Sequence, residues 1–216
     1  MIPDRCAFSR ENTRLQRPPH TPELELHLAD EITPIWRMTE EALAEIGLPP
    51  PFWAFAWAGG QALARYVLDS PQVVAGKAVV DFASGSGLVA IAAARAGAAR
   101  VLAADIDPFC GAALALNASA NGVAAEFTDA DLLDAAPPGW ADVILAGDIC
   151  YEKPLAERVM AWLRTARAAG AEVMIGDPGR SYFPRTGLVK LAEYQVPTTR
   201  ELEDMEVKRT AVWRLP

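Results

Sequence analysis

Two glycines and two aspartates form the pattern in this sequence with the clearest chemical meaning. An apolar run ends at Asp81 and passes into a turn that contains Gly85 and Gly87, after which the sequence is rich in alanine. Because glycine has no Cβ, such a turn lets the backbone approach a ligand closely at the start of a helix. A second acid, Asp105, follows the next apolar run, where a carboxylate accepts hydrogen bonds from ribose hydroxyls. The pattern predicts a site for a cofactor that contains a nucleoside.

Two classes of cofactor fit this pattern. Residues 85–90 satisfy the glycine fingerprint of dinucleotide-binding proteins, which predicts a dehydrogenase. Asp81 favours another cofactor, because its carboxylate would lie close to the pyrophosphate of a dinucleotide. S-adenosylmethionine instead presents an ammonium and a sulfonium, which a carboxylate attracts. We therefore expect S-adenosylmethionine and keep two alternatives, a nicotinamide dinucleotide and a turn that binds no ligand.

The residues expected to bind S-adenosylmethionine lie in the turn and at the ends of the apolar runs: Trp57, Asp81, Ala83, Ser84, Gly85, Gly87, Asp105, Ile106, Asp131 and Leu132. The backbone of the turn would contact the methionine part, and Asp105 would accept both ribose hydroxyls. Ile106 would pack on the adenine ring, and Asp131, with Leu132 beside it, would accept from the adenine amino group. A helix cap is the alternative role for Asp131. Trp57 precedes two glycines at a helix start, where its ring could wall the pocket.

The segment Asp148-Ile-Cys-Tyr151 is a second candidate motif and follows a later apolar run. An amine that accepts a methyl group must first lose its proton, and a nearby carboxylate raises the pKa of an amine. We therefore interpret Asp148 as a group that holds and orients the amine, with the proton leaving to solvent or through a water. Tyr151 could orient the nitrogen with its hydroxyl or face the cation with its ring. An aromatic packed at a helix start is the alternative for Tyr151.

These motifs resemble those of a known enzyme family. Residues 81–87 resemble motif I of the seven-strand, Rossmann-like methyltransferases. The Asp148-Ile-Cys-Tyr151 segment is similar to the Asp/Glu-x-x-Tyr/Phe motif of a branch that methylates protein lysines. The electron-transfer flavoprotein β-subunit lysine methyltransferase group is closely similar from about residue 50 to the C-terminus, including residues 53–60 and 177–180.

The resemblance implies methyl transfer from S-adenosylmethionine to lysine side chains of the flavoprotein β-subunit, by direct displacement. Two other functions stay open for this sequence. One is a small-molecule amine N-methyltransferase of the same fold, which a deep, lidded pocket would favour. The other is a protein that binds the cofactor without turnover and serves as an assembly partner; the presence of both Asp148 and Tyr151 argues against it.

Strands that alternate with helices must position these residues. Strands are predicted at residues 77–82, 100–105, 124–128, 142–146, 172–176, 191–196 and 206–215, and helices at 61–68, 87–96, 108–121 and 154–168. This order predicts an α/β fold: a Rossmann-like three-layer sandwich with a seven-stranded, mostly parallel sheet and an antiparallel C-terminal hairpin strand. Ligands bind beyond the carboxyl ends of the strands in such sheets, where the motif acids lie.

The chain is predicted to divide into an N-terminal extension, residues 1–48, and a methyltransferase domain, residues 49–216. Residues 1–22 contain four prolines and are expected to be loose. A short strand is predicted at 24–28 and a helix at 39–47.

The composition limits which partners, metals and cellular compartments we expect for this protein. The formal net charge of the 216-residue chain is −8 and there is no block of basic residues, so we expect no nucleic-acid substrate. No apolar run approaches the roughly 18 residues of a membrane span, and no secretory pattern opens the chain, so we expect a cytoplasmic protein. Three scattered cysteines and two histidines show no metal-ligand spacing, so we expect no metal and a reducing compartment.

Overall fold

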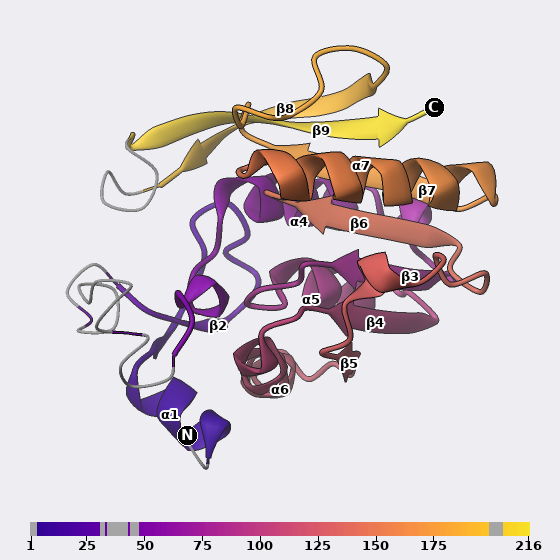
Figure 1. Cartoon of the computed structure of the whole chain (residues 1–216). Coiled ribbons are helices and arrows are strands. Elements are labelled where there is room, and N and C mark those ends of the chain that lie inside the picture. The colour runs from indigo at the N-terminus through magenta and orange to yellow at the C-terminus, as the bar shows by residue number, and fades with distance from the viewer. Residues whose placement is uncertain (1–3, 31–32, 34–42, 44–47, 199–204) are drawn as a thin grey trace.

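A seven-stranded sheet forms the centre of the computed structural model, which describes residues 4–30, 33, 43, 48–198 and 205–216. The strand order is β5-β4-β3-β6-β7-β9-β8 (Figure 1). The first five strands in this order are parallel: β5 (Glu126–Thr128), β4 (Arg100–Ala104), β3 (Ala78–Phe82), β6 (Val143–Gly147) and β7 (Glu172–Asp177). The strand β9 (Val207–Leu215) runs antiparallel to both β7 and β8 (Val189–Pro197). The predicted sheet, with its antiparallel C-terminal hairpin, is confirmed.

Helices cover both faces of the sheet, which gives three layers (Figure 1). The main helices are α4 (Ala58–Asp69), α5 (Leu88–Arg95), α6 (Pro108–Ala120) and α7 (Lys153–Ala168). Successive strand residues face opposite layers, as the period of two requires: Val143 and Leu145 of β6 pack with α4 and α5, whereas Ile144 and Ala146 pack with α7. In the described part of the chain, no helix is both long and apolar enough to cross a bilayer.

The N-terminal segment is more ordered than its prolines suggest. The helix α1 (Arg5–Glu11) and the strand β1 (Arg14–Gln16) lie where a loose segment was expected, and β1 pairs with the predicted strand, β2 (Leu26–Leu28). The ring of Phe8 contacts that of Phe109 at the start of α6, with ring centroids 5.6 Å apart. Tertiary contacts of this kind outweigh weak local propensity. The helix predicted at 39–47 lies outside the described residues, except for Leu43.

Three short 3₁₀ helices complete the described elements: η1 (Phe52–Ala54), η2 (Pro71–Val73) and η3 (Leu132–Asp134).

The first turn of α4 lies directly against the ends of β6 and β7. A Cβ added to Gly59 would lie 2.3 Å from the carbonyl oxygen of Gly176, and one added to Gly147 would lie 2.9 Å from the backbone of Gly60. The sequence predicted this helix only from Gln61, because glycine is a poor helix former. The structure begins the helix at Ala58 because the two glycines permit this close approach.

Candidate active site

The residues predicted to act on ligands meet at one edge of the sheet. Parallel pairing of β3 with β4 and β6, and of β6 with β7, aligns the carboxyl ends of the four strands. The glycine turn follows β3, Asp105 follows β4, Asp148 follows β6, and Asp177 ends β7. The sheet therefore brings the cofactor motif and the Asp148-Ile-Cys-Tyr151 motif to neighbouring positions.

The turn after β3 uses left-handed backbone and internal hydrogen bonds. Ala83, Gly85 and Gly87 have φ values of 55°, 52° and 78°. The N–H of Gly85 donates to a carboxylate oxygen of Asp105 at 2.9 Å, and the N–H of Gly87 donates to the carbonyl of Ser84 at 2.8 Å. A phosphate at this turn would find these two N–H groups already engaged. The geometry therefore disfavours a pyrophosphate at these two N–H groups.

Asp81 lies beneath the turn rather than beside an open space. Its side chain is 1% exposed and accepts a hydrogen bond from the N–H of Ala90 in α5, at 2.9 Å. Burial raises its pKa to about 8, although this hydrogen bond favours the charged form, and the charge of Asp105 adds to the increase. Asp81 therefore holds the start of α5 in place. Its direct contact with a cofactor stays a prediction.

Asp105 keeps acceptor lone pairs that could bind ribose hydroxyls. One carboxylate oxygen accepts from Gly85 and the other from the N–H of Asp107, at 3.0 Å. Each oxygen retains a second lone pair for a hydroxyl donor. Ile106 beside it is 70% exposed, and among the described residues the buried hydroxyl of Ser84 has no hydrogen-bond partner. A nucleoside cofactor fits this combination of an acid, an exposed apolar side chain and an unpaired hydroxyl.

Asp131 is a helix cap in the structure. It accepts a hydrogen bond from the N–H of Leu133 at 2.9 Å, at the start of η3, and its other oxygen lies 3.7 Å from Arg158. This is the alternative role that its position at a helix start allowed. Leu132 packs partly against the core under α7. Contacts of both residues with adenine stay predictions.

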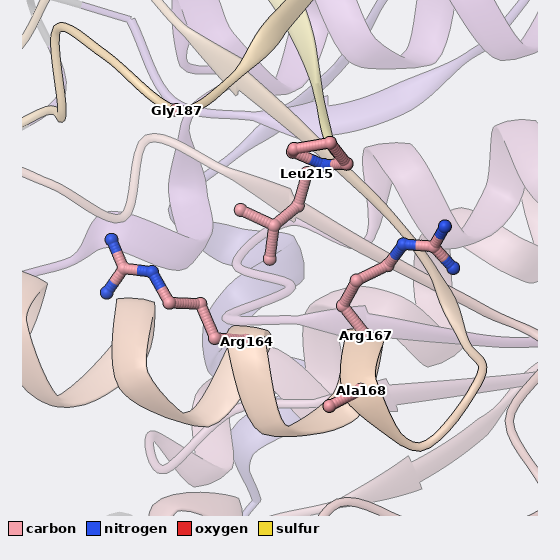
Figure 2. A pocket seen from close by; sticks show the side chains of 6 residues that line it. Arg164, Arg167, Ala168, Gly187 and Leu215 are labelled. Atoms are coloured by element: carbon pink, nitrogen blue, oxygen red, sulfur yellow. The ribbon is translucent and has the colours of Figure 1, made fainter.

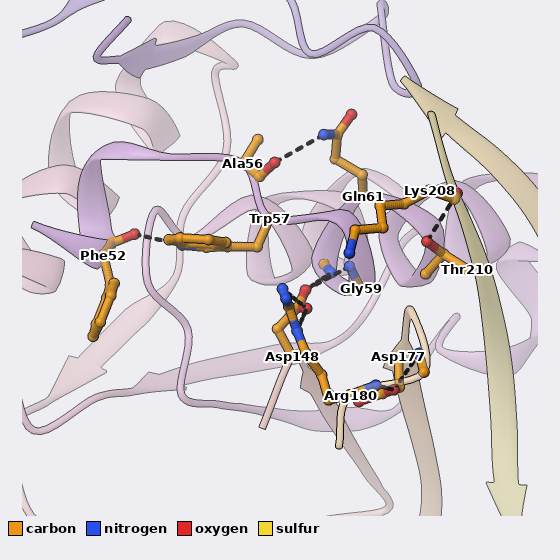
Figure 3. Close-up of polar contacts among 12 residues, drawn as sticks. Phe52, Ala56, Trp57, Gly59, Gln61, Asp148, Asp177, Arg180, Lys208 and Thr210 are labelled. Carbon is orange, nitrogen blue, oxygen red and sulfur yellow. Dashed lines mark hydrogen bonds and ion pairs between the residues drawn. The ribbon is translucent and has the colours of Figure 1, made fainter. Parts of the chain in front are cut away.

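An aromatic segment connects the glycine turn to the second motif. The indole N–H of Trp57 donates to the carbonyl of Phe52 at 3.0 Å (Figure 3), and this carbonyl lies 3.7 Å from where a Cβ on Gly85 would be. The ring centroid of Phe52 is 5.7 Å from that of Trp57 and 6.0 Å from that of Tyr151. Tyr151 is 50% exposed. The structure thus places Trp57 and Tyr151 around one space beside the turn.

Asp148 connects the start of α4 with the loop after β7 (Figure 3). Its Oδ2 accepts from the N–H groups of Gly59 and Gly60, at 2.5 Å and 3.2 Å. Its Oδ1 accepts from Nε and Nη2 of Arg180, at 3.0 Å and 2.6 Å. A carboxylate offers about four acceptor positions, so these four hydrogen bonds fill them. Asp148 adopts a left-handed φ of 57°, which these contacts hold in place.

The structure pairs Arg180, in the loop after β7, with Asp148. The loop folds around Asp177, whose Oδ1 accepts from the N–H groups of Gly179 and Arg180 at 2.7 Å and 2.8 Å. Burial raises the pKa of Asp177 to about 7, and the charge of Asp148 adds to the increase. The sequence signal was the acid at a strand end followed by proline and glycine, which indicates a tight turn. No local rule indicates that its arginine reaches a residue 32 positions earlier.

The cysteines near the site are protonated thiols. Burial, with the charges of Asp177 and Asp148, raises the pKa of Cys150 to about 12, and burial also raises the pKa of Cys110. Among the described residues, no group of three histidine, cysteine or acidic side chains is placed to hold a metal ion. The chemistry at this edge therefore belongs to carboxylates, backbone amides, an arginine and aromatic rings.

A hollow lies on the surface near the C-terminal end of α7 (Figure 2). It has a volume of about 480 Å³ and is lined by Arg164, Arg167, Ala168, Gly187, Leu215 and Pro216. Its two arginines belong to the last turns of α7, whereas Asp148 and Tyr151 precede the first turn. This hollow is therefore separate from the candidate active site.

Comparison with known proteins identifies relatives of this chain among methyltransferases. Residues 61–166 match the family model described as ribosomal protein L11 methyltransferase (PrmA). The chain is 41% identical to the electron transfer flavoprotein beta subunit lysine methyltransferase of Danio rerio, over 90% of this chain and 76% of that protein. It is 37% identical to the Homo sapiens protein of the same name, over 98% and 82%. A solved structure with a similar fold is magnesium protoporphyrin IX methyltransferase from Synechocystis PCC 6803, at a TM-score of 0.52 and 17% identity, over 73% of this chain and 81% of that one.

Proposed function

The chain belongs to the electron-transfer flavoprotein β-subunit lysine methyltransferase family, and from this premise we propose that it transfers methyl groups from S-adenosylmethionine to lysine side chains of that β-subunit. The observation that carries the proposal is the adjacency of the two motifs. Phe52 contacts Trp57 on one side and Tyr151 on the other, and its carbonyl lies beside Gly85. A cofactor at the turn and an amine at Tyr151 would therefore be neighbours.

The cofactor half of the proposal assigns roles to residues around the turn. S-adenosylmethionine supplies a methyl group on a sulfonium. The backbone at Ala83, Gly85 and Gly87 would hold its methionine part, with Ser84 and Asp81 supporting the turn. Asp105 would accept the ribose hydroxyls, as its remaining lone pairs allow. The adenine would lie between Ile106 and the Asp131–Leu132 segment, and Trp57 would wall the pocket.

The acceptor half assigns catalytic roles to Asp148 and Tyr151. Direct displacement needs the lysine nitrogen aligned with the methyl group and shielded from water. The hydroxyl of Tyr151 would orient the nitrogen. Asp148 would orient it electrostatically, through the charge of a carboxylate that the α4 amides and Arg180 hold rigidly. The proton of the amine leaves to solvent or through a water, because no free acceptor position remains on Asp148.

The openness of this edge supports a protein substrate over a small amine. Phe52 and Tyr151, which flank the acceptor position, are both about half exposed. A small-molecule enzyme would enclose its substrate, whereas a lysine on a protein surface must enter from outside with its backbone left behind. The described residues present such an open approach.

We also propose a protein rather than a nucleic-acid partner, and a reducing compartment such as the cytoplasm. The net charge of −8 opposes binding to a phosphate backbone. All three cysteines are free, which is typical of a reducing environment.

The test uses purified protein, S-adenosylmethionine labelled on its methyl group, and purified electron-transfer flavoprotein, with a cell lysate in parallel. We expect label on the β-subunit, and none with Asp148→Ala. Label only in the small-molecule fraction would assign the metabolite alternative instead. Cofactor binding without any labelled product would assign the non-catalytic alternative.

A further inference from the structure

A carboxylate beside the acceptor nitrogen creates a chemical difficulty. Free lysine has a pKa of about 10.4, so about one molecule in a thousand is neutral near pH 7.4. Only the neutral amine has the lone pair that attacks a methyl group. An unbalanced carboxylate raises the pKa of a nearby amine further, by stabilising the ammonium. Asp148 alone would therefore hold the substrate in its unreactive form.

The structure balances the charge of Asp148 from two directions. The two α4 amides bind one oxygen, and the guanidinium of Arg180 binds the other through two nitrogens. The side chains of Asp148 and Arg180 are only 10% and 20% exposed, so solvent screens the pair little. The guanidinium carbon also lies 6.0 Å from the ring centroid of Trp57, close to the cofactor side of the site. An amine at this position would meet a neutral ion pair and the positive end of a helix.

The remaining titratable groups around this position carry charges of both signs, and the negative charges of Glu152 and Asp105 contribute to the raised pKa of the Tyr151 hydroxyl. Burial raises the pKa of Asp177 to about 7, so this acid is partly neutral at physiological pH. Cys150 stays a thiol, and burial raises the pKa of the Tyr151 hydroxyl, so it stays protonated. From β9, the side chain of Lys208 extends toward the start of α4 (Figure 3) and brings a positive charge. Arg180 bonds Asp148 directly, through two of its nitrogens.

We propose that Arg180 is an electrostatic positioning residue: by pairing with Asp148 it keeps the acceptor lysine nitrogen in its neutral, reactive form. The inference rests on the proposed function, because it concerns the amine that this function brings to the site. In this proposal, Asp148 holds the start of α4 and the loop after β7 in place, and Arg180 balances the negative charge of Asp148.

The test measures the single-turnover rate of methyl transfer to electron-transfer flavoprotein, with enzyme and cofactor saturating, across pH 6 to 10. The variants are Arg180→Gln, which removes the charge, and Arg180→Lys, which keeps it. Arg185→Gln is the matched control, because it removes the same charge from an exposed position of the same loop. Cofactor dissociation constants and melting temperatures are measured for all variants.

We expect the acid limb of the rate profile to move up by about one pH unit or more in Arg180→Gln. Relative to wild type, the rate of this variant at neutral pH should then fall about tenfold more than its plateau rate at high pH does. The limb should stay in place in Arg180→Lys and Arg185→Gln. If Arg180→Gln lowered the rate of methyl transfer by the same factor at every pH, the proposal would be overturned, and Arg180 would have a packing role only. A gain in rate at every pH would also overturn it, because Arg180 would then be a competitor that the lysine displaces.

The wild-type protein supplies an independent check that needs no variant. The midpoint of the acid limb of the wild-type rate profile should lie well below the pKa of free lysine. A midpoint at or above that pKa would overturn the inference, even if Arg180→Gln failed to fold. Absence of transfer by the wild type would overturn the proposed function, and the inference with it. Transfer with an unmoved limb in Arg180→Gln would overturn the inference alone.

Discussion

Two aspartates at the ends of neighbouring strands show how the same residue type serves two purposes. Asp81 in β3 and Asp148 after β6 each accept a hydrogen bond from the first turns of a helix. Among the described residues, Asp81 meets one amide and no cation, and burial raises its pKa to about 8. Asp148 meets two amides and the guanidinium of Arg180. The first is built as a neutral group that holds a turn, and the second as a charge in an ion pair.

The difference separates the cofactor half of the site from the acceptor half. Around Asp81, the partners come from one short stretch of sequence, since Ala90 lies nine residues away. Around Asp148, the partners come from α4 and from the loop after β7, 89 residues before it and 32 residues after it. The turn that Asp81 supports is a local motif, whereas the surroundings of Asp148 exist only when three distant segments pack together.

The largest expected effect comes from removing the carboxylate of Asp148, the charged one of the two aspartates. Asp148→Ala should lower the rate of methyl transfer more than about a hundredfold, because it releases Arg180 and the start of α4 from the acceptor position. Cofactor binding, measured by calorimetry, should remain within a few-fold, because the hydrogen bonds of Asp148 join α4 to the loop after β7 and not to the turn after β3. Loss of cofactor binding with undiminished turnover per bound cofactor would contradict the division into two halves.

Next in size is a pair of adjacent glycine variants that test how α4 reaches Asp148. A Cβ on Gly59 would lie 2.3 Å from the carbonyl of Gly176 and 2.5 Å from Oδ2 of Asp148, so Gly59→Ala must displace the helix start. We expect a loss of about 1–3 kcal/mol in the free energy of unfolding, with methyl transfer reduced more than cofactor binding.

Gly60→Ala is the matched control for this variant. Its Cβ would meet only a methyl group of Val89 at 3.9 Å, which is ordinary contact. Alanine in a helix should then stabilise the protein by up to about 1 kcal/mol. Urea unfolding of both variants checks the pair. Equal effects at the two positions would show that α4 does not depend on the close approach of Gly59.

The same contrast explains what could be predicted from the sequence. The alternation of strands and helices indicated the sheet, and the glycine turn with Asp105 indicated the cofactor half, because these signals lie within short windows. The pairing of Asp148 with Gly59 and Arg180 lacked such a signal. Hydrogen bonds between residues so far apart in the chain depend on how α4 and the β7 loop pack, and single-sequence patterns do not encode that packing.

The start of α4 and the N-terminal segment also depend on tertiary contacts that local sequence patterns do not predict. The helix α4 was predicted from Gln61 because Gly59 and Gly60 have low helix propensity, yet their small size is what lets the helix reach the sheet. The strand β1 has three residues, too few for a sequence pattern to identify it, so only its pairing with β2 defines it. In both cases tertiary contacts outweighed local preference.

Asp105 supplies the next prediction, within the cofactor half. Asp105→Ala removes the acid expected to bind ribose and the acceptor for Gly85, so the cofactor dissociation constant should rise about tenfold or more. Asp107→Ala is the matched control two residues later. Asp107 caps α6 through the N–H of Phe109, so its loss should cost about 1 kcal/mol of stability and leave cofactor affinity nearly unchanged. An unchanged dissociation constant for Asp105→Ala would contradict the ribose assignment.

The smallest effect, and the sharpest test of the comparison, is the pH dependence of stability at Asp81. The folded protein keeps the proton of Asp81 up to a pH of about 8, because burial raises its pKa, whereas the unfolded chain loses that proton near a pKa of about 3.9. Unfolding therefore releases a proton between these values, and this residue makes the free energy of unfolding fall as pH rises through that window. Asparagine has a similar shape and cannot ionise. The stability of Asp81→Asn relative to wild type, from urea unfolding at pH 5 and pH 8, should increase with pH. A difference that stays constant between the two pH values would show that Asp81 is charged in the folded protein, like Asp148, and would remove the contrast between the two strand ends.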